Sequence, residues 1–255
     1  MAKREKKPES IVEFIKTIIY AGLIAVGIHT FLFQPFYIPS GSMVPSLRVD
    51  DFVIVNKFAY GYSRYSFPFA PDLFSGRIFG SMPKRGAVVV FRPPGANDDF
   101  IKRVIGLPGD TVQMKQGELY TNGTLVPRTY VGQYVDTSSP DLGPVVTKYY
   151  NEHLPGGVTH PIIKVTNGPE FFGGLDPNNT PLYVVPPGHL FMMGDNRDNS
   201  EDSRFLDGPV GYVPEENIIG PAEIIFFSIH LDHPFWEFWE WPFEIRWDRL
   251  FHSVP

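Results

Sequence analysis

The feature that most constrains this chain is an apolar segment near its N-terminus, residues 17–33, which carries no formal charge when histidine is neutral. A helix that crosses a bilayer needs roughly 17–25 predominantly apolar residues, so the segment is just long enough. The first eight residues carry four cations, namely Lys3, Arg4, Lys6 and Lys7. Because positively charged flanks stay in the cytoplasm, we expect a cytoplasmic N-terminus over 1–10, a transmembrane anchor helix over 11–36, and the remainder on the outer side.

Two other interpretations of this segment compete with the anchor. A cleaved signal peptide ends in small residues of an A-x-A-like pattern. The segment ends instead in bulky residues, among them Phe31, Leu32 and Phe33. A buried helix of a soluble protein usually has a polar face, and no such face interrupts the run. The uncleaved anchor is therefore the favoured interpretation.

Composition favours β structure for the rest of the 255 residues. The counts of 22 Phe, 26 Pro and 24 Gly indicate many short strands and turns. A net charge of −6 offers no basic face for nucleic acid. The absence of cysteine excludes disulfides, thiolate nucleophiles and cysteine-ligated metals. We expect no metal site, because the spacing of the histidines suggests none.

A short turn with two serines follows the anchor directly. We expect Gly41 to give the backbone a conformation closed to other residues, and prolines on both sides to stiffen the turn. Such a turn could present Ser42 at a surface. Ser40 stands where a G-x-S-x-G elbow needs its first glycine, so that motif does not apply. Most Ser-Gly-Ser segments are simple turns, and the turn alone leaves both possibilities open.

Strand-like runs follow at residues 51–57, 87–91 and 100–106. In the third run, the alternation of a strand places Lys102 and Arg103 on opposite faces, so one of the two cations should be partly buried. A buried lysine loses its proton readily, and its neutral amine is a competent base for a serine hydroxyl. The alternative is a lysine whose stem packs on the strand while its ammonium group reaches solvent.

The middle of the chain predicts a smaller β subdomain. Asn122-Gly123 between two strand-like runs is a strong signal for a β-hairpin, and residues 130–187 are rich in turns. We expect the first part of a catalytic β core at residues 37–111 and an inserted β subdomain at 112–187. The second part of the core should follow at 188–230, and a Trp-rich tail at 231–255.

A second polar cluster occupies residues 194–204. A calcium loop starting at Asp195 or Asp198 would close on Leu206 or Pro209, neither of which can bind the ion. A solvated loop and a hydrogen-bonded shell that supports a catalytic amine both remain possible. A separate S-x-x-K match at residues 81–84 is interrupted by proline, and no K-T-G follows.

Residues 39–43, 101–110 and 194–204, in this order, resemble the three motifs of bacterial type I signal peptidase (leader peptidase), the membrane-bound serine protease family with a Ser/Lys dyad. The resemblance implies a core of coiled antiparallel sheets with a second domain inserted. It also implies an endopeptidase that removes signal peptides from exported preproteins through an acyl-enzyme, at the outer face of the bacterial cytoplasmic membrane and without metal or organic cofactor.

The resemblance also implies roles for individual residues. Ser42 would be the nucleophile and Lys102 the general base. The backbone N–H of Ser42 and the hydroxyl of Ser40 would form the oxyanion hole, and Ser200 would orient the lysine. Ala87 stands where the family usually has Asp, which affects local hydrogen bonding and leaves the dyad untouched.

The family pattern assigns two further groups of residues. Asp202 and Arg204 would form a structural ion pair behind the site. Phe36, Ile38 and Ile101 would line shallow apolar pockets for the small side chains at −1 and −3 of the cleavage site. Two other functions remain open, namely a specialised peptidase of the same fold and a catalytically silent, membrane-anchored β adaptor.

Two aromatic segments could lie against lipid. All four tryptophans fall between residues 236 and 247, and residues 58–82 form an aromatic segment with few charges. Tryptophan is enriched at the membrane interface. For both segments the alternative is packing onto the protein's own β core.

Overall fold

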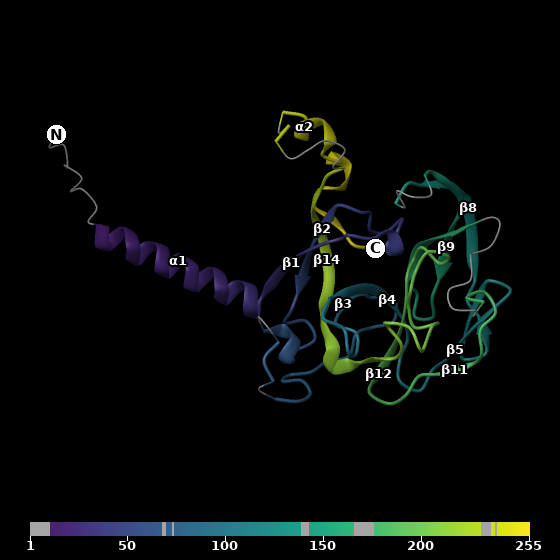
Figure 1. The fold of residues 1–255 in the computed structure, drawn as a ribbon. Coiled ribbons are helices and arrows are strands. Elements are labelled where there is room, and N and C mark those ends of the chain that lie inside the picture. The colour runs from purple at the N-terminus through teal and green to yellow at the C-terminus, as the bar shows by residue number, and fades with distance from the viewer. Residues whose placement is uncertain are drawn as a thin grey trace.

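A computed structural model describes residues 11–67, 70–72, 74–138, 143–165, 176–230, 236–237 and 239–255. The described chain is mostly β, as predicted, with a curled antiparallel sheet and an apolar N-terminal helix (Figure 1). The main sheet has eight strands, in the order β1-β2-β14-β3-β4-β12-β13 with β15 paired to β14. Its strands are β1 (Phe33–Tyr37), β2 (Asp51–Asn56), β3 (Val88–Phe91), β4 (Phe100–Gly106), β12 (His189–Met193), β13 (Val213–Pro214), β14 (Ile218–Ser228) and β15 (His252–Ser253).

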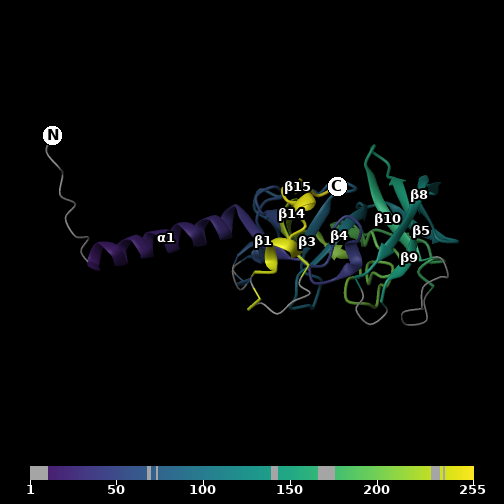
Figure 2. The same ribbon diagram turned by 90° about the horizontal axis from the view of Figure 1, so that it is seen from above.

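The N-terminal helix α1 (Ile11–Phe31) projects from the body of the protein, exposed along almost its whole length (Figures 1 and 2). Its 21 residues span about 31 Å at ~1.5 Å per residue, close to the ~30 Å thickness of a bilayer's hydrocarbon core. Among the described residues it is the one helix long and apolar enough to cross a membrane.

The prediction of a helix as far as residue 36 is wrong at its C-terminal end. The helix stops at Phe31, and β1 begins at Phe33. Pro35 has no N–H for a helical hydrogen bond, and its ring disfavours the helical conformation of the preceding residue. The segment pairs instead with β2 in antiparallel register.

Strand β4 occupies the middle of the main sheet, between β3 and β12. Its bounds match the predicted strand at 100–106, whereas β2 and β3 are each slightly shorter than predicted. Both faces of β4 are covered, so Lys102 and Arg103 are both buried, with 4% and 0% of their surfaces exposed. The sequence predicted burial for only one of the two.

Two smaller sheets lie beyond the main sheet, at the end of the molecule opposite α1 (Figure 2). The three-stranded sheet has the order β10-β9-β8, and the four-stranded sheet has the order β11-β5-β6-β7. Their strands are β5 (Thr111–Lys115), β6 (Glu118–Thr121), β7 (Thr124–Leu125), β8 (Arg128–Asp136), β9 (Val145–His153), β10 (Thr159–Val165) and β11 (Tyr183–Val184).

The β6–β7 hairpin turns at the predicted position. Asn122 and Gly123 have φ angles of 51° and 75°, the positive pair that a type I′ turn requires. The strands of both smaller sheets lie between Thr111 and Val184. The inserted subdomain expected at residues 112–187 stays a prediction.

Candidate active site

Ser42 lies in a single 3-10 turn, η1 (Gly41–Met43), just past the end of β1. The turn is closed by a hydrogen bond from Val44 N to Gly41 O at 3.1 Å. Ser42 is largely buried, with 8% of its surface exposed, whereas Ser40 is exposed. The two hydroxyl oxygens are 3.4 Å apart, so the first serine reaches the second.

Gly41 is needed in this turn for a reason that the sequence did not reveal. Its φ angle is not in the positive region, so the expected special backbone conformation is wrong. A Cβ added at this position would instead overlap the Cβ and Oγ atoms of Ser138, beyond the end of β8. The glycine therefore allows the smaller sheets to approach the backbone beside Ser42.

Lys102 reaches Ser42 from the neighbouring strand. Lys102 Nζ donates a hydrogen bond to Ser42 Oγ at 2.6 Å, although the two residues are 60 positions apart. Burial lowers the pKa of Lys102 to about 8, against the opposing effect of Asp202 and Asp195. The structure thus brings together a hydroxyl and an amine that titrates far more easily than a lysine in water.

The loop of residues 194–204 holds the serine turn in place. Asn196 N donates to Ser42 O, and Asn196 Nδ2 donates to Gly41 O, both at 3.1 Å. The same amide nitrogen donates to Asp136 Oδ2 at 2.8 Å. Ser46 Oγ donates to Asp195 Oδ2 at 2.5 Å. The turn and the residue three positions after it are therefore tied to this loop.

Asp195 also anchors the strand that carries Lys102. Arg103 Nε and Nη2 donate to its two carboxylate oxygens at 2.8 and 2.7 Å. Burial alone would raise the pKa of Asp195, but the guanidinium of Arg103 outweighs it and the pKa is lowered. One carboxylate thus fixes the strand of the amine relative to the turn of the hydroxyl.

Asp202 and Arg204 form an ion pair behind the lysine. Arg204 Nε and Nη2 donate to Asp202 Oδ1 and Oδ2 at 2.8 and 2.9 Å, and both residues are buried. Gly194 N donates to the same carboxylate at 3.0 Å. Ser200 is a buried member of the 194–204 loop, and its hydroxyl has no hydrogen-bond partner among the described residues. Its predicted role in orienting the lysine stays a prediction.

The three residues assigned to the substrate pockets lie in one place. Ile38 and Ile101 belong to the same buried apolar cluster, and Phe36 packs against it half-buried. Ile38 is only 1% exposed and Ile101 9%. Any surface they offer a substrate is therefore small and apolar.

A search with protein-family models matches residues 11–227 to the family described as signal peptidase, peptidase S26. The chain belongs to this family. It is 40% identical to the signal peptidase I of Rickettsia typhi over 219 residues, which cover 80% of this chain and 76% of the relative. It is 41% identical to that of Rickettsia akari over 221 residues, covering 82% and 77%.

A solved structure of a signal peptidase I from Enterococcus faecalis is also similar, at 26% identity over 56% of this chain and 97% of that one. Its TM-score of 0.33 is too low to support an argument about the fold. Membership of the family makes the chain a serine endopeptidase and supports the cleavage of signal peptides. Together with α1, the bacterial relatives support a protein anchored in the inner membrane.

The sequence analysis did not predict two buried residues beside the candidate site. Glu152 on β9 and His160 on β10 are partners in the antiparallel register and are both buried. His160 Nε2 is 3.2 Å from Glu152 Oε2, and His160 Nδ1 is 3.2 Å from Asp195 Oδ1. Glu152 also pairs with Arg197. In the sequence the two residues lie at equal distances on either side of the Pro-Gly-Gly turn, and this symmetry could have indicated that they pair across a hairpin.

The polar loop at 194–204 combines its internal Asp202–Arg204 ion pair with charged partners from three strands. These partners are Arg103 on β4, Glu152 on β9 and Lys164 on β10. Ile163 on β10 adds two backbone bonds, because its N–H donates to Asp195 O and its carbonyl accepts from Arg197 N, at 3.0 and 3.1 Å. The smaller sheet thus forms a base for the loop.

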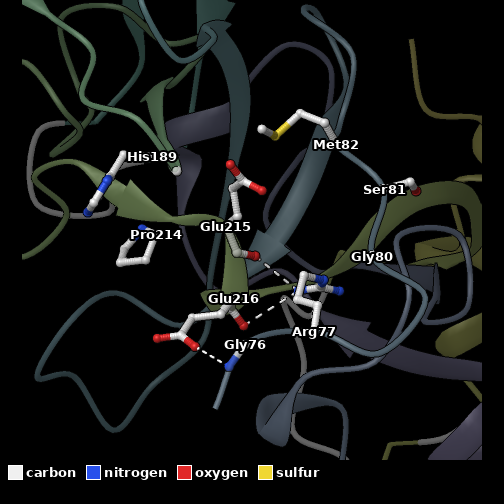
Figure 3. A pocket seen from close by; sticks show the side chains of 10 residues that line it. Gly76, Arg77, Gly80, Ser81, Met82, His189, Pro214, Glu215 and Glu216 are labelled. Carbon is white, nitrogen blue, oxygen red and sulfur yellow. Dashed lines mark hydrogen bonds between the residues drawn. The ribbon is translucent and has the colours of Figure 1, made fainter.

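A cavity of about 600 Å³ lies elsewhere and contains none of these residues (Figure 3). It is lined by Arg77, Glu215 and Glu216 among others. Arg77 donates from this wall to the backbone oxygens of Gly61 and Ile218 at 2.6 and 2.5 Å. These bonds tie the described part of residues 58–82 to the core, whereas residues 68, 69 and 73 lie outside the described residues. Among the described residues no cluster of His, Asp or Glu could hold a metal ion.

Proposed function

We propose that this protein cleaves N-terminal signal peptides from exported preproteins with Ser42 as nucleophile and Lys102 as general base, through an acyl-enzyme. The observation that carries the proposal is the 2.6 Å hydrogen bond from Lys102 Nζ to Ser42 Oγ inside a buried site. A base must lie within hydrogen-bond reach of the proton that it removes, and this amine meets that condition.

The lysine must be neutral to accept a proton. With a pKa of about 8, roughly one molecule in ten has a neutral Lys102 at pH 7. With the usual lysine value of about 10.4 the fraction would be only about one in 2,500. Desolvation thus makes the base available without any other basic side chain.

The reaction follows from these positions. Ser42 Oγ attacks the scissile carbonyl while its proton passes to Lys102 Nζ. The tetrahedral intermediate then collapses to a serine ester, and the protonated amine gives its proton to the leaving amino group. Water next attacks the ester as Lys102 takes its proton, and collapse of this second intermediate returns the proton to Ser42 Oγ and releases the signal peptide with a free carboxyl group.

The oxyanion needs hydrogen-bond donors that are in place beforehand. Ser42 stands at the start of η1, where the N–H groups of a helical turn have no partner within the turn. Its own N–H is therefore available, and the Ser40 hydroxyl, 3.4 Å from Ser42 Oγ, lies beside it. An oxyanion hole is usually formed by two such donors. Ser200 completes the proposed site as a support for the amine.

We assign the catalytic domain to the outer side of the membrane, because the basic residues precede α1. The Trp-rich tail supports contact with the bilayer on this side. Trp247 and Phe243 are 64% and 85% exposed. Arg249 ties the tail to the core, because it donates to Asp51 Oδ2 at 2.5 Å.

Cleavage of a purified preprotein by the wild type, Ser42→Ala and Lys102→Ala tests the proposal. We expect both variants to lose activity by at least ~10³-fold, since the nucleophile and its base act as a unit. The readout is the release of the mature protein, whose new N-terminus should be the same whichever variant releases it. Undiminished cleavage by either variant would overturn the dyad and favour a different catalytic group.

A further inference from the structure

The junction between α1 and the catalytic sheet contains almost no linker. The helix ends at Phe31 and β1 begins at Phe33, so Leu32 alone separates them (Figure 1). Leu32 O accepts a hydrogen bond from Lys57 N at 2.9 Å. The anchor therefore enters the sheet directly.

Lys57, just beyond the end of β2, holds the last turns of the helix. It is 1% exposed, and its Nζ donates to His29 O at 3.2 Å and to Gln34 Oε1 at 2.9 Å. The carbonyls of the last helical turn lack partners within the helix and carry the negative end of its dipole. An ammonium group is the favourable partner for such a carbonyl. The catalytic chemistry makes no use of this buried cation.

A second contact holds the same end of the helix. Tyr62 OH donates to Phe31 O at 2.7 Å, and the rings of these two residues pack edge to face at 6.0 Å. The Phe31 ring also contacts Phe67 at 5.9 Å. Side chains from the segment after β2 therefore grip both the backbone and the side chain of the final helical residue.

We propose that Lys57 and Tyr62 clamp the outer end of the anchor to the catalytic sheet and so select the bond that is cut, by fixing the height of Ser42 above the bilayer. This inference rests on the proposed function. It treats Lys57 and Tyr62 as positioning residues for the cleavage site.

The geometry makes such a selection possible. An extended chain advances at most about 3.3–3.6 Å per residue, so Ser42 lies no farther than roughly 30 Å from Phe33. The substrate is held in the same membrane by its own apolar run. Moving the cut by one residue moves the scissile carbonyl by about 3.3 Å relative to the bilayer. If the anchor is clamped to the sheet, Ser42 moves relative to the bilayer by less than the length of one residue. A free hinge between the anchor and the sheet would allow larger movements.

The test uses the full-length protein in liposomes and two membrane-inserted preproteins with the same cleavage sequence. In one the site has its natural distance from the apolar run, and in the other roughly three extra residues move it by ~10 Å. We expect the wild type to cleave the preprotein with the natural distance faster than the other. Lys57→Met should reduce this preference by about tenfold, equivalent to ~1.4 kcal/mol. Tyr62→Phe keeps the ring and should give a smaller reduction.

Two matched controls separate the clamp from general effects. Lys148→Met and Tyr130→Phe make the same chemical changes at exposed positions of the three-stranded sheet and should leave the preference unchanged. A short soluble peptide reports on the dyad alone, and its cleavage should be equal in all variants.

Three outcomes would overturn the inference. An unchanged spacing preference in both Lys57→Met and Tyr62→Phe would show that the contacts do not set the height. An equal loss of peptide and preprotein cleavage would show that the two substitutions act on the dyad and not on the height of the site. If the wild type cut neither preprotein nor peptide, the proposed function itself would fail.

Discussion

The dependence of activity on pH gives the sharpest test of the lysine base. Catalysis requires the neutral amine, so kcat/KM should fall as pH drops below the pKa of Lys102, which burial lowers to about 8. Below that value the rate should fall about tenfold per pH unit, since one proton inactivates one base. At pH 6 roughly 1% of the molecules would be active.

A single exposed carboxylate tunes this value. Glu201 acts on Lys102 through its charge and raises the pKa, whereas it is itself exposed at the protein surface. Glu201→Gln removes this stabilisation of the ammonium form, so the pKa of Lys102 should fall and the acid limb should move to lower pH. We expect a shift of a few tenths of a unit, which is about twofold in rate at pH 6. Because an exposed charge is screened, the shift should shrink at about 1 M salt.

The assay is the cleavage of a fluorogenic signal-sequence peptide between about pH 5 and about pH 10 at low and high salt. Asp207→Asn is the matched control, an exposed carboxylate in the same region that is not among the largest influences on the pKa of Lys102. An acid limb near the ordinary lysine value would refute the desolvation argument. A limb that Glu201→Gln moves upward would refute the sign of the electrostatic effect.

Three further predictions follow from contacts around the site. Gly41→Ala should lower kcat/KM by about tenfold or more, because its Cβ overlaps Ser138, and Ser138→Gly should restore much of the loss by opening the same space. His160→Leu should cost about 1–3 kcal/mol in the free energy of unfolding, measured by urea titration, since it places an apolar side chain against two buried carboxylates; an unchanged midpoint would contradict this. Intrinsic tryptophan emission should shift to the blue on adding anionic lipid vesicles if the exposed tail inserts its rings; unaltered emission would count against membrane contact by the tail.

The local features of the fold could be predicted from the sequence. The bounds of β4 and the turn at Asn122-Gly123 depend on neighbouring residues, namely an apolar run with alternation and a pair that tolerates positive φ. The end of α1 was misplaced because apolar character continues past Phe31. Hydropathy alone does not show that residues 33–37 form a strand that pairs with β2.

The candidate site needed more than local pattern. Ser42 and Lys102 are 60 positions apart, and only the resemblance to a family joined them before the geometry was known. The pairing of Glu152 and His160 across β9 and β10 depends on the register of a hairpin, which periodicity does not fix. The reason for Gly41 lay in Ser138, almost 100 residues away, and no local rule points to such a contact.

The alternation of β4 has a consequence for how this protein can change by insertion or deletion. Lys102 and Arg103 are neighbours that face opposite sides, where one meets a hydroxyl and the other a carboxylate. Val89 fixes this arrangement through its register with Lys102. A slip of one residue would bring Ile101 or Arg103 to the position of Lys102, and neither an apolar side chain nor an arginine that keeps its proton can act as the base. A change in the length of residues 92–99 that shifted the pairing would therefore silence the enzyme while every catalytic residue remained in the sequence.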